Sequence, residues 1–124
     1  MELKRADRED SRQSSLSSVR DHLIVNLPDN FDDHDLSALE EEVLSRLSLN
    51  KRIRGVIIDF ANVQSTDADD LCRLQNCLLA VRLLGRNVAL CGINPGVAAV
   101  IIRTGQDLHR DLVGQDINDV LQKV

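Results

Sequence analysis

A short polar segment in the middle of the chain carries the side chains best suited to chemistry. Ser65 and Thr66 offer hydroxyl groups, and Asp67, Asp69 and Asp70 offer carboxylates. The segment follows an apolar run and precedes a helical pattern, which places it in a loop where α/β proteins often present functional groups. It contains no glycine-rich phosphate loop and no histidine beside a nucleophile. These residue types favour recognition, or modification of a side chain, over turnover of a small molecule.

The three carboxylates allow two interpretations. Hard divalent cations prefer several oxygen ligands, so Asp67 and Asp69 are candidates for the centre of a metal-dependent enzyme. Aspartate is also a preferred N-cap, and acidic residues stabilise the first turn of a helix. Asp69 and Asp70 are adjacent, so on a helix their side chains point about 100° apart and do not both face one ion. We favour capping, and we expect neither a metal nor another cofactor.

Composition limits the partners. The chain has 124 residues, a net charge of −5 and 43% hydrophobic residues, but only 2% aromatic residues. One domain with an aliphatic core is therefore expected. Nucleic-acid binding is not expected, because it normally needs a basic face or aromatic stacking surfaces. No apolar run approaches the length of a membrane span and no secretory signal begins the chain, so we expect a cytoplasmic protein with no membrane partner.

The remaining reactive side chains form no recognisable site. Three cysteines have spacings that suit neither a disulfide framework nor a metal centre, which favours a reducing compartment: Cys72, Cys77 and Cys91. The histidines are scattered, and none accompanies a nucleophile: His22, His34 and His109. The turn at residues 92–96 lacks the lysine and the glycine spacing of a nucleotide loop. Carboxylates at the helix start would repel phosphate, so a nucleotide-binding module is the least favoured class.

Hydrophobic patterning predicts alternating strands and helices. Apolar runs rich in β-branched residues predict strands at residues 22–27, 55–60 and 88–91. Apolar residues at three- and four-residue steps predict helices at residues 33–49, 67–84, 95–104 and 116–122. The expected buried residues of the second helix are Leu71, Leu74, Leu78, Val81 and Leu83. The strand at 55–60 is apolar throughout, which indicates burial on both faces.

This order of elements predicts an α/β domain. Its sheet should be mixed and mostly parallel, with about four to five strands and with helices packed mainly on one face. Residues 106–113 are irregular, with at most a short strand. Residues 1–18 are polar and charged, so we interpret them as a mobile tail that leads into a short edge strand around residues 16–19. Residues 19–124 then form a single domain.

With these elements placed, the chain resembles the STAS domain, the fold of sulphate transporters and anti-sigma-factor antagonists. Within that family it resembles the RsbS-type and RsbR-type proteins of bacterial stressosomes. Three stretches carry the resemblance: residues 21–35, 55–67 and 80–108. The pattern Gly-Ile-x-Pro-x-Val-Ala at residues 92–98 is the most specific part. The resemblance covers residues 21–124 and leaves out the tail.

The resemblance implies a function. In such proteins the turn before the helix carries an aspartate followed by a serine or threonine, which a switch kinase phosphorylates. Here Asp67 matches the aspartate, but Ala68 stands at the hydroxyl position. The implied protein is a non-catalytic, RsbS-like scaffold in stress signalling. It would assemble with itself and with RsbR-like sensors, and it would bind an RsbT-like serine/threonine switch kinase. The implied partner-binding turn comprises Ser65, Thr66, Asp67, Ala68, Asp69, Asp70 and Cys72.

Several explanations of Ala68 remain open. The protein is a scaffold that cannot be switched, or Asp69 imitates the phosphorylated form in part, because a carboxylate carries less charge than a phosphate. Alternatively, phosphorylation has moved to Thr66 or Ser65, or Ala68 is an engineered substitution. We favour a scaffold of altered regulation. The main rival in the same class is a small free anti-sigma-factor antagonist that binds one anti-sigma kinase.

Overall fold

The computed structural model describes residues 15–104, 108 and 112–124. These residues form a five-stranded sheet in the order β1-β2-β3-β4-β5. β1 (Ser15–Val19) pairs antiparallel with β2 (His22–Asn26). The sheet then continues in parallel through β3 (Gly55–Asp59), β4 (Asn87–Cys91) and β5 (Leu112–Gly114). The mixed, mostly parallel sheet expected from the sequence is confirmed.

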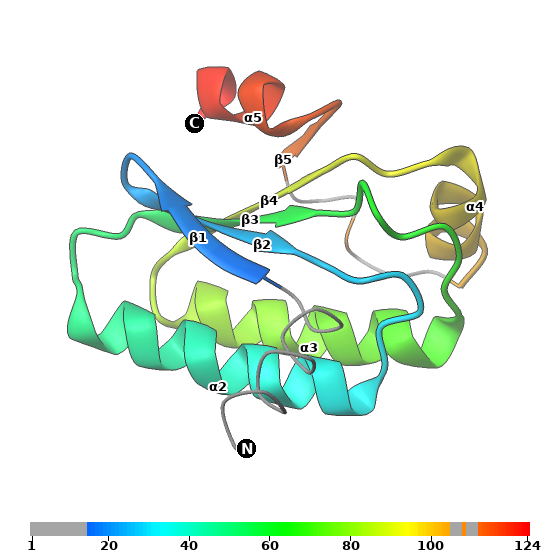
Figure 1. The fold of residues 1–124 in the computed structure, drawn as a ribbon, viewed down its shortest axis with the longest axis horizontal. Coiled ribbons are helices and arrows are strands. Elements are labelled where there is room, and N and C mark those ends of the chain that lie inside the picture. Colours follow the sequence, from blue (N-terminus) through cyan, green and yellow to red (C-terminus); the bar gives the residue numbers. More distant parts are fainter. Residues whose placement is uncertain (1–14, 105–107, 109–111) are drawn as a thin grey trace, which may run out of the picture.

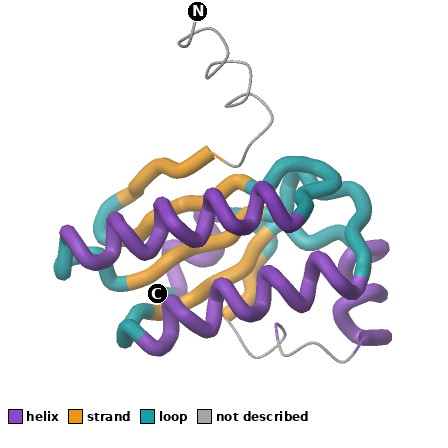
Figure 2. The backbone as a smooth tube through the Cα atoms, turned by 90° about the horizontal axis from the view of Figure 1, so that it is seen from below, coloured by secondary structure: helices purple, strands orange, loops and turns teal. Residues whose placement is uncertain are grey.

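Helices cover the two faces of the sheet unequally. α2 (Asp33–Leu49) and α3 (Ala68–Leu83) lie side by side on one face, and the short α5 (Ile117–Lys123) lies on the other (Figures 1 and 2). α4 (Pro95–Thr104) lies at one end of the sheet (Figure 1). The expectation that helices pack mainly on one face is therefore confirmed.

The central strand β3 is buried on both faces, as its uninterrupted apolar run predicts. Val56 and Ile58 belong to the large core cluster that contains the buried residues of α2 and α3. Ile57 belongs to a second cluster that contains Val120 of α5. The register aligns Ile57 with Ile24 of β2, so the smaller helix covers a continuous apolar strip.

The buried stripe of α3 differs from the expected one at one residue. Leu83 is 79% exposed, so its expected burial is wrong. It follows Val81 by two residues, which turns its side chain about 200° around the helix and away from the sheet. Cys77 is buried instead, since it follows Leu74 by three residues and falls on the same stripe. The other expected residues are buried: Leu71, Leu74, Leu78 and Val81.

The sheet begins earlier than the expected domain boundary. β1 pairs with β2 along its whole length, so residues 15–18 belong to the sheet and not to a tail. This pairing corrects the boundary between residues 18 and 19. Arg20, in the left-handed region at φ 56°, allows the tight turn between the two strands. The described residues do not include residues 1–14, 105–107 and 109–111. The rest of the expected tail and His109 therefore lie outside the described residues.

The parallel strands bring three loops to one edge of the sheet. β2, β3 and β4 point the same way, and each ends in a loop that leads to the start of α2, α3 or α4. The loop at residues 60–67 follows the central strand of these three, so its neighbours are the loops at residues 27–32 and 92–94. Among the described helices, none combines the length and the apolar character needed to span a bilayer.

Candidate functional site

The candidate site is the turn between β3 and α3. Two buried side chains, one aromatic and one aliphatic, anchor the start of this turn. Phe60 is fully buried and Val63 is 1% exposed. The Phe60 N–H donates to the Cys91 carbonyl at 2.9 Å, and the Val63 N–H donates to the Phe60 carbonyl at 2.9 Å. Because these anchors fix the start of the turn, the polar residues that follow Val63 are held at the surface.

Two residues from neighbouring loops brace the turn. Asp29 Oδ1 accepts the Gln64 N–H at 2.9 Å. Asn94 Nδ2 donates to the Val63 carbonyl at 3.0 Å and to the Gln64 carbonyl at 3.3 Å. Asn94 Oδ1 also accepts the Val97 N–H at 2.8 Å, which caps the start of α4. The turn is therefore fixed to the loops on both sides, and the sequence reasoning missed both bracing residues.

Asp67 caps α3, which confirms the capping interpretation of the carboxylates. Its Oδ1 accepts the Asp70 N–H at 2.9 Å, and Asp69 and Asp70 lie in the first helical turn. Partial burial raises the pKa of Asp70 above its ordinary value of 3.8, and the carboxylates of Asp67, Asp32 and Asp69 raise it further. The helix start thus carries several mutually repelling negative charges beside the cap.

The remaining residues of the predicted turn differ in their accessibility. Ser65 and Cys72 are exposed, and Ala68, the first residue of α3, is partly buried. The Thr66 hydroxyl oxygen is buried and has no hydrogen-bond partner. Ser65 is therefore accessible from solvent, whereas the Thr66 hydroxyl is not.

The start of α2 lies beside the start of α3 and is tied to it. Arg73 of α3 forms an ion pair with Asp33 of α2, with 2.6 Å between Nε and Oδ1. The same guanidinium donates to the Ser37 hydroxyl at 3.4 Å. Asp32 caps α2, and its side chain and that of Asp35 each accept the other's backbone N–H. Both helix starts therefore form one rigid, acidic surface with the turn.

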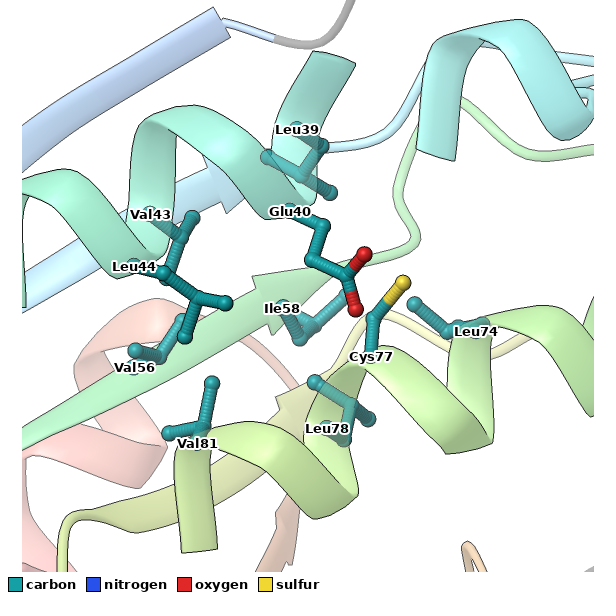
Figure 3. A pocket seen from close by; sticks show the side chains of 10 residues that line it. All are labelled: Leu39, Glu40, Val43, Leu44, Val56, Ile58, Leu74, Cys77, Leu78 and Val81. Carbon is teal, nitrogen blue, oxygen red and sulfur yellow. The ribbon is translucent and has the colours of Figure 1, made fainter. Parts of the chain in front are cut away.

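The space between α2 and α3 is closely packed. A cavity of about 10 Å³ lies there, close to the smallest volume that admits one water molecule. Figure 3 shows the Glu40 carboxylate of α2 beside the Cys77 thiol of α3, among aliphatic side chains. Burial, and then the Glu40 carboxylate, raise the pKa of Cys77 to about 11. This thiol stays protonated at neutral pH, so the cavity supports packing and not nucleophilic chemistry.

The histidines and cysteines that the structure describes do not gather into one site at the turn. Across residues 15–104, 108 and 112–124, no group of three or more His, Cys, Asp or Glu side chains is arranged to hold a metal ion. His22 is buried, and its Nδ1 lies 2.9 Å from Asp21 Oδ1 at the opposite edge of the sheet. His34 is exposed in the first turn of α2. Cys91 is buried in β4, and burial raises its pKa to about 12.

This arrangement of sheet, helices and turn matches a known domain family. The family model for the STAS domain matches residues 14–113, so the chain belongs to the STAS domain family. The fold and the placement of the turn agree with the resemblance found in the sequence. A comparison with curated proteins found no match.

Solved structures of anti-sigma-factor antagonists and stressosome proteins share the fold. A serine-to-glutamate variant of RsbS from Moorella thermoacetica is 23% identical, with a TM-score of 0.76, over 89% of this chain and 92% of that chain. A structure describing the stressosome as a signal integration and transduction hub is 24% identical, with a TM-score of 0.77, over 88% and 94% of the chains. The unphosphorylated anti-sigma factor antagonist SpoIIAA is 13% identical, with a TM-score of 0.72, over 89% and 94%. These likenesses agree with the STAS fold of this chain.

Proposed function

We propose that this protein is a non-catalytic, RsbS-like regulatory scaffold that acts in the cytoplasm in stress signalling. Its partners would be other STAS proteins, including RsbR-like sensors and further copies of itself, and an RsbT-like serine/threonine switch kinase. The proposed partner-binding surface is the turn and helix start at residues 65–72. Membership of the STAS family and the likeness to RsbS support this assignment.

The observation that carries the proposal is the construction of this surface. Asp67 caps α3 as a rigid helix start, and the braces from Asp29 and Asn94 hold the turn in place. A surface fixed in this way loses little conformational freedom when a partner binds. Ala68 removes the hydroxyl from the first helical position, so the surface stays available without phosphorylation at that residue.

Regulation at a neighbouring hydroxyl would fall on Ser65 rather than Thr66. The Ser65 side chain is exposed, whereas the Thr66 oxygen is buried without a partner. A phosphate on Ser65 would add nearly two negative charges close to Asp67 and Asp69, and would change partner binding mainly through charge. If it is not modified, Asp69 supplies a single permanent charge on the same surface.

The direct test is to purify the tagged protein from its own cells and identify its partners by mass spectrometry. We expect other STAS proteins and a small kinase of the ATPase type, with phosphate on Ser65 if that residue has replaced the missing acceptor. Cys72→Arg places a bulky charge on the proposed surface and should reduce kinase recovery. Ser45→Arg makes the same charge change at an exposed position of α2 and serves as the matched control.

The outcomes separate the candidates. Recovery of a single anti-sigma kinase without other STAS proteins would favour a free antagonist, which the likeness to SpoIIAA also supports. Equal kinase recovery with Cys72→Arg and Ser45→Arg would show that the turn is not the binding surface. If Asp69 imitates a phosphate, Asp69→Ser should tighten kinase binding several-fold, and an unchanged affinity would remove that explanation. The metal-dependent enzyme has less support, because the Asp67 carboxylate is already engaged as a cap.

A further inference from the structure

A hollow beside the end of α2 brings a serine and two arginines together. Ser18 of β1, Arg20 of the β1–β2 turn and Arg46 of the last turn of α2 line one hollow of about 220 Å³. Asn50, the C-cap of α2, lines it as well, and aliphatic side chains form most of the rest. The β1–β2 turn and the end of α2 lie at the same end of the molecule (Figure 1). Two parts of the chain that are distant in the sequence therefore meet at one small concave surface.

The register of the sheet places the Ser18 side chain on the α2 side. Ser18 is paired with Leu23, which belongs to the core cluster beneath α2 and α3. Directly paired residues of two antiparallel strands point to the same face of a sheet. Ser17 is paired with Ile24, which belongs to the cluster beneath α5, so its side chain points to the opposite face. Both serines are exposed, so they offer the same chemical group on opposite faces.

The two arginines of the hollow lack an acidic partner. Within the part of the chain that the structure describes, neither the Arg20 nor the Arg46 side chain forms a hydrogen bond or an ion pair. The Asp21 carboxylate, next to Arg20, is instead held by His22, with 2.9 Å between Oδ1 and Nδ1. Glu42, one helical turn before Arg46, does not pair with it either. Two like charges at one small hollow repel each other, and an anion between them would remove this repulsion.

We propose that Ser18 is a phosphorylation site and that Arg20 and Arg46 hold its phosphate. A protein serine kinase would transfer the γ-phosphoryl group of ATP to the Ser18 oxygen. The bond from the γ-phosphorus to its bridging oxygen breaks, ADP leaves and the hydroxyl proton is released. The product carries nearly two negative charges, which match the two guanidinium groups in number and bind them through pairs of hydrogen bonds. The N–H groups of the Asn50 side chain are also free to donate, because its oxygen already accepts the Arg52 N–H at 3.0 Å.

The surroundings of Ser18 favour both the transfer and the product. β1 is an edge strand, so Ser18 is presented to a kinase on an extended segment that opens more readily than a central strand. The dipole of α2 places only about half a negative charge near the hollow, which the two full positive charges outweigh. Lys51 and Arg52 are exposed in the loop that follows α2 and add to the positive charge of this end.

The phosphate would fasten the edge strand to the end of α2. It would do so at the edge of the sheet where β2 and β3 begin, whereas the turn at residues 65–72 follows the opposite edge, where they end. Ala68 leaves that turn without a hydroxyl group at the first helical position. Phosphorylation of Ser18 would therefore be a separate regulatory input, and it does not depend on the proposed function.

The first test incorporates phosphoserine into the full chain at position 18 or, as the matched control, at position 17. Phosphorus NMR then follows the second ionisation of each phosphate. At position 17 its pKa should keep the ordinary value of about 6, whereas at position 18 the two arginines should lower it by about one unit. Arg46→Gln should reverse most of this shift. Phosphate at position 18 should also raise the Tm by about 4 °C, and phosphate at position 17 should change it by no more than about 1 °C.

The second test asks whether cells modify Ser18. Trypsin cuts after Arg12 and Arg20, so residues 13–20 form one peptide, and its fragment masses distinguish Ser18 from Ser17. We expect phosphate on Ser18 in protein purified from growing or from stressed cells.

Three outcomes overturn the inference. One is a phosphate at position 18 that ionises with the same pKa as the phosphate at position 17, which would show that the arginines do not hold it. Another is a Ser18 peptide that carries no phosphate in either growing or stressed cells. The third is stabilisation of the unmodified chain by about 10 mM inorganic phosphate, lost in Arg46→Gln, without phosphate on Ser18 in cells, which would assign the hollow to a free anion. None of these results bears on partner recovery through the turn at residues 65–72.

Discussion

Removing the cap at Asp67 tests how the turn is held. Asp67→Ala leaves the Asp70 N–H without its acceptor, which now lies at 2.9 Å. Loss of an N-cap of this kind costs about 1 kcal/mol, within a range of about 0.5 to 2 kcal/mol. For a domain of this size, the free energy of unfolding falls by about 2 kcal/mol per molar urea. The urea concentration at the unfolding midpoint should therefore fall by about 0.5 M.

Asp67→Asn separates capping from charge. Asparagine caps as well as aspartate does. It also removes a negative charge that repels the Asp70 carboxylate, although it loses an attraction to the helix dipole of similar size. We therefore expect a stability within about 0.5 kcal/mol of the wild type. Asp69→Ala, at an exposed first-turn position that caps nothing, should also stay within that range.

The assay is urea unfolding followed by far-UV circular dichroism, because the chain has no Trp and no Tyr for intrinsic fluorescence. If Asp67→Asn is as destabilised as Asp67→Ala, the negative charge and not the cap matters, and the reasoning is refuted. A repeat with Mg²⁺ tests the rival enzyme interpretation. Stabilisation by Mg²⁺ that disappears in Asp67→Asn would support a metal site, and we expect no Mg²⁺ effect on either protein.

Three further predictions follow from other contacts. A thiol reagent at pH 8 should modify the exposed Cys72 quickly, but Cys77 and Cys91 only on unfolding. Both of these thiols are buried, and burial raises their pKa values to about 11 and 12. Rapid labelling of all three cysteines would contradict this burial. Asn94→Ala should lower the free energy of unfolding by about 2 kcal/mol, because a helix cap and two hydrogen bonds are lost. It should also speed hydrogen exchange at residues 63–64. Asn94→Asp keeps the cap and should lower the free energy of unfolding by less. The backbone N–H of residue 115 lowers the pKa of Asp119 from 3.8. The Asp119 carboxylate therefore contributes to stability above pH 3.8, and this contribution is lost as the pH falls below that value. Asp119→Asn should flatten the acid side of the profile of stability against pH.

Elements with local signals could be predicted from the sequence. The bounds of α2 match the expected helix at residues 33–49, because an aspartate cap and a regular apolar stripe both lie within the segment. The buried central strand followed from one uninterrupted apolar run. Leu83 departs from the expected stripe because its position around the helix, and not its apolar character, decides its exposure. Cys77 lies three residues after Leu74 and four residues before Val81, so it falls on the buried side of the helix instead.

Details of the site that depend on distant residues could not be predicted. The Gln64 N–H finds its acceptor on Asp29, 35 residues away, and the Val63 carbonyl finds its donor on Asn94, 31 residues away. No local pattern encodes such pairs, although an asparagine directly before the helix-starting Pro95 is a recognisable cap. The burial of the Thr66 hydroxyl also has no local signal in the sequence.

The geometry of the turn also bears on how a phosphate at Ser65 would act. At a helix start, a phosphate usually gains hydrogen bonds from free backbone N–H groups. Here the Asp67 carboxylate already accepts the Asp70 N–H, and Asp69 adds a further negative charge. A phosphate on Ser65 would therefore be repelled by the helix start more than it is bound there, and would project toward solvent or toward a partner. Its main effect would fall on the partner-binding surface and not on the fold. Ser65→Glu should therefore change partner binding while leaving the free energy of unfolding within about 0.5 kcal/mol of the wild type.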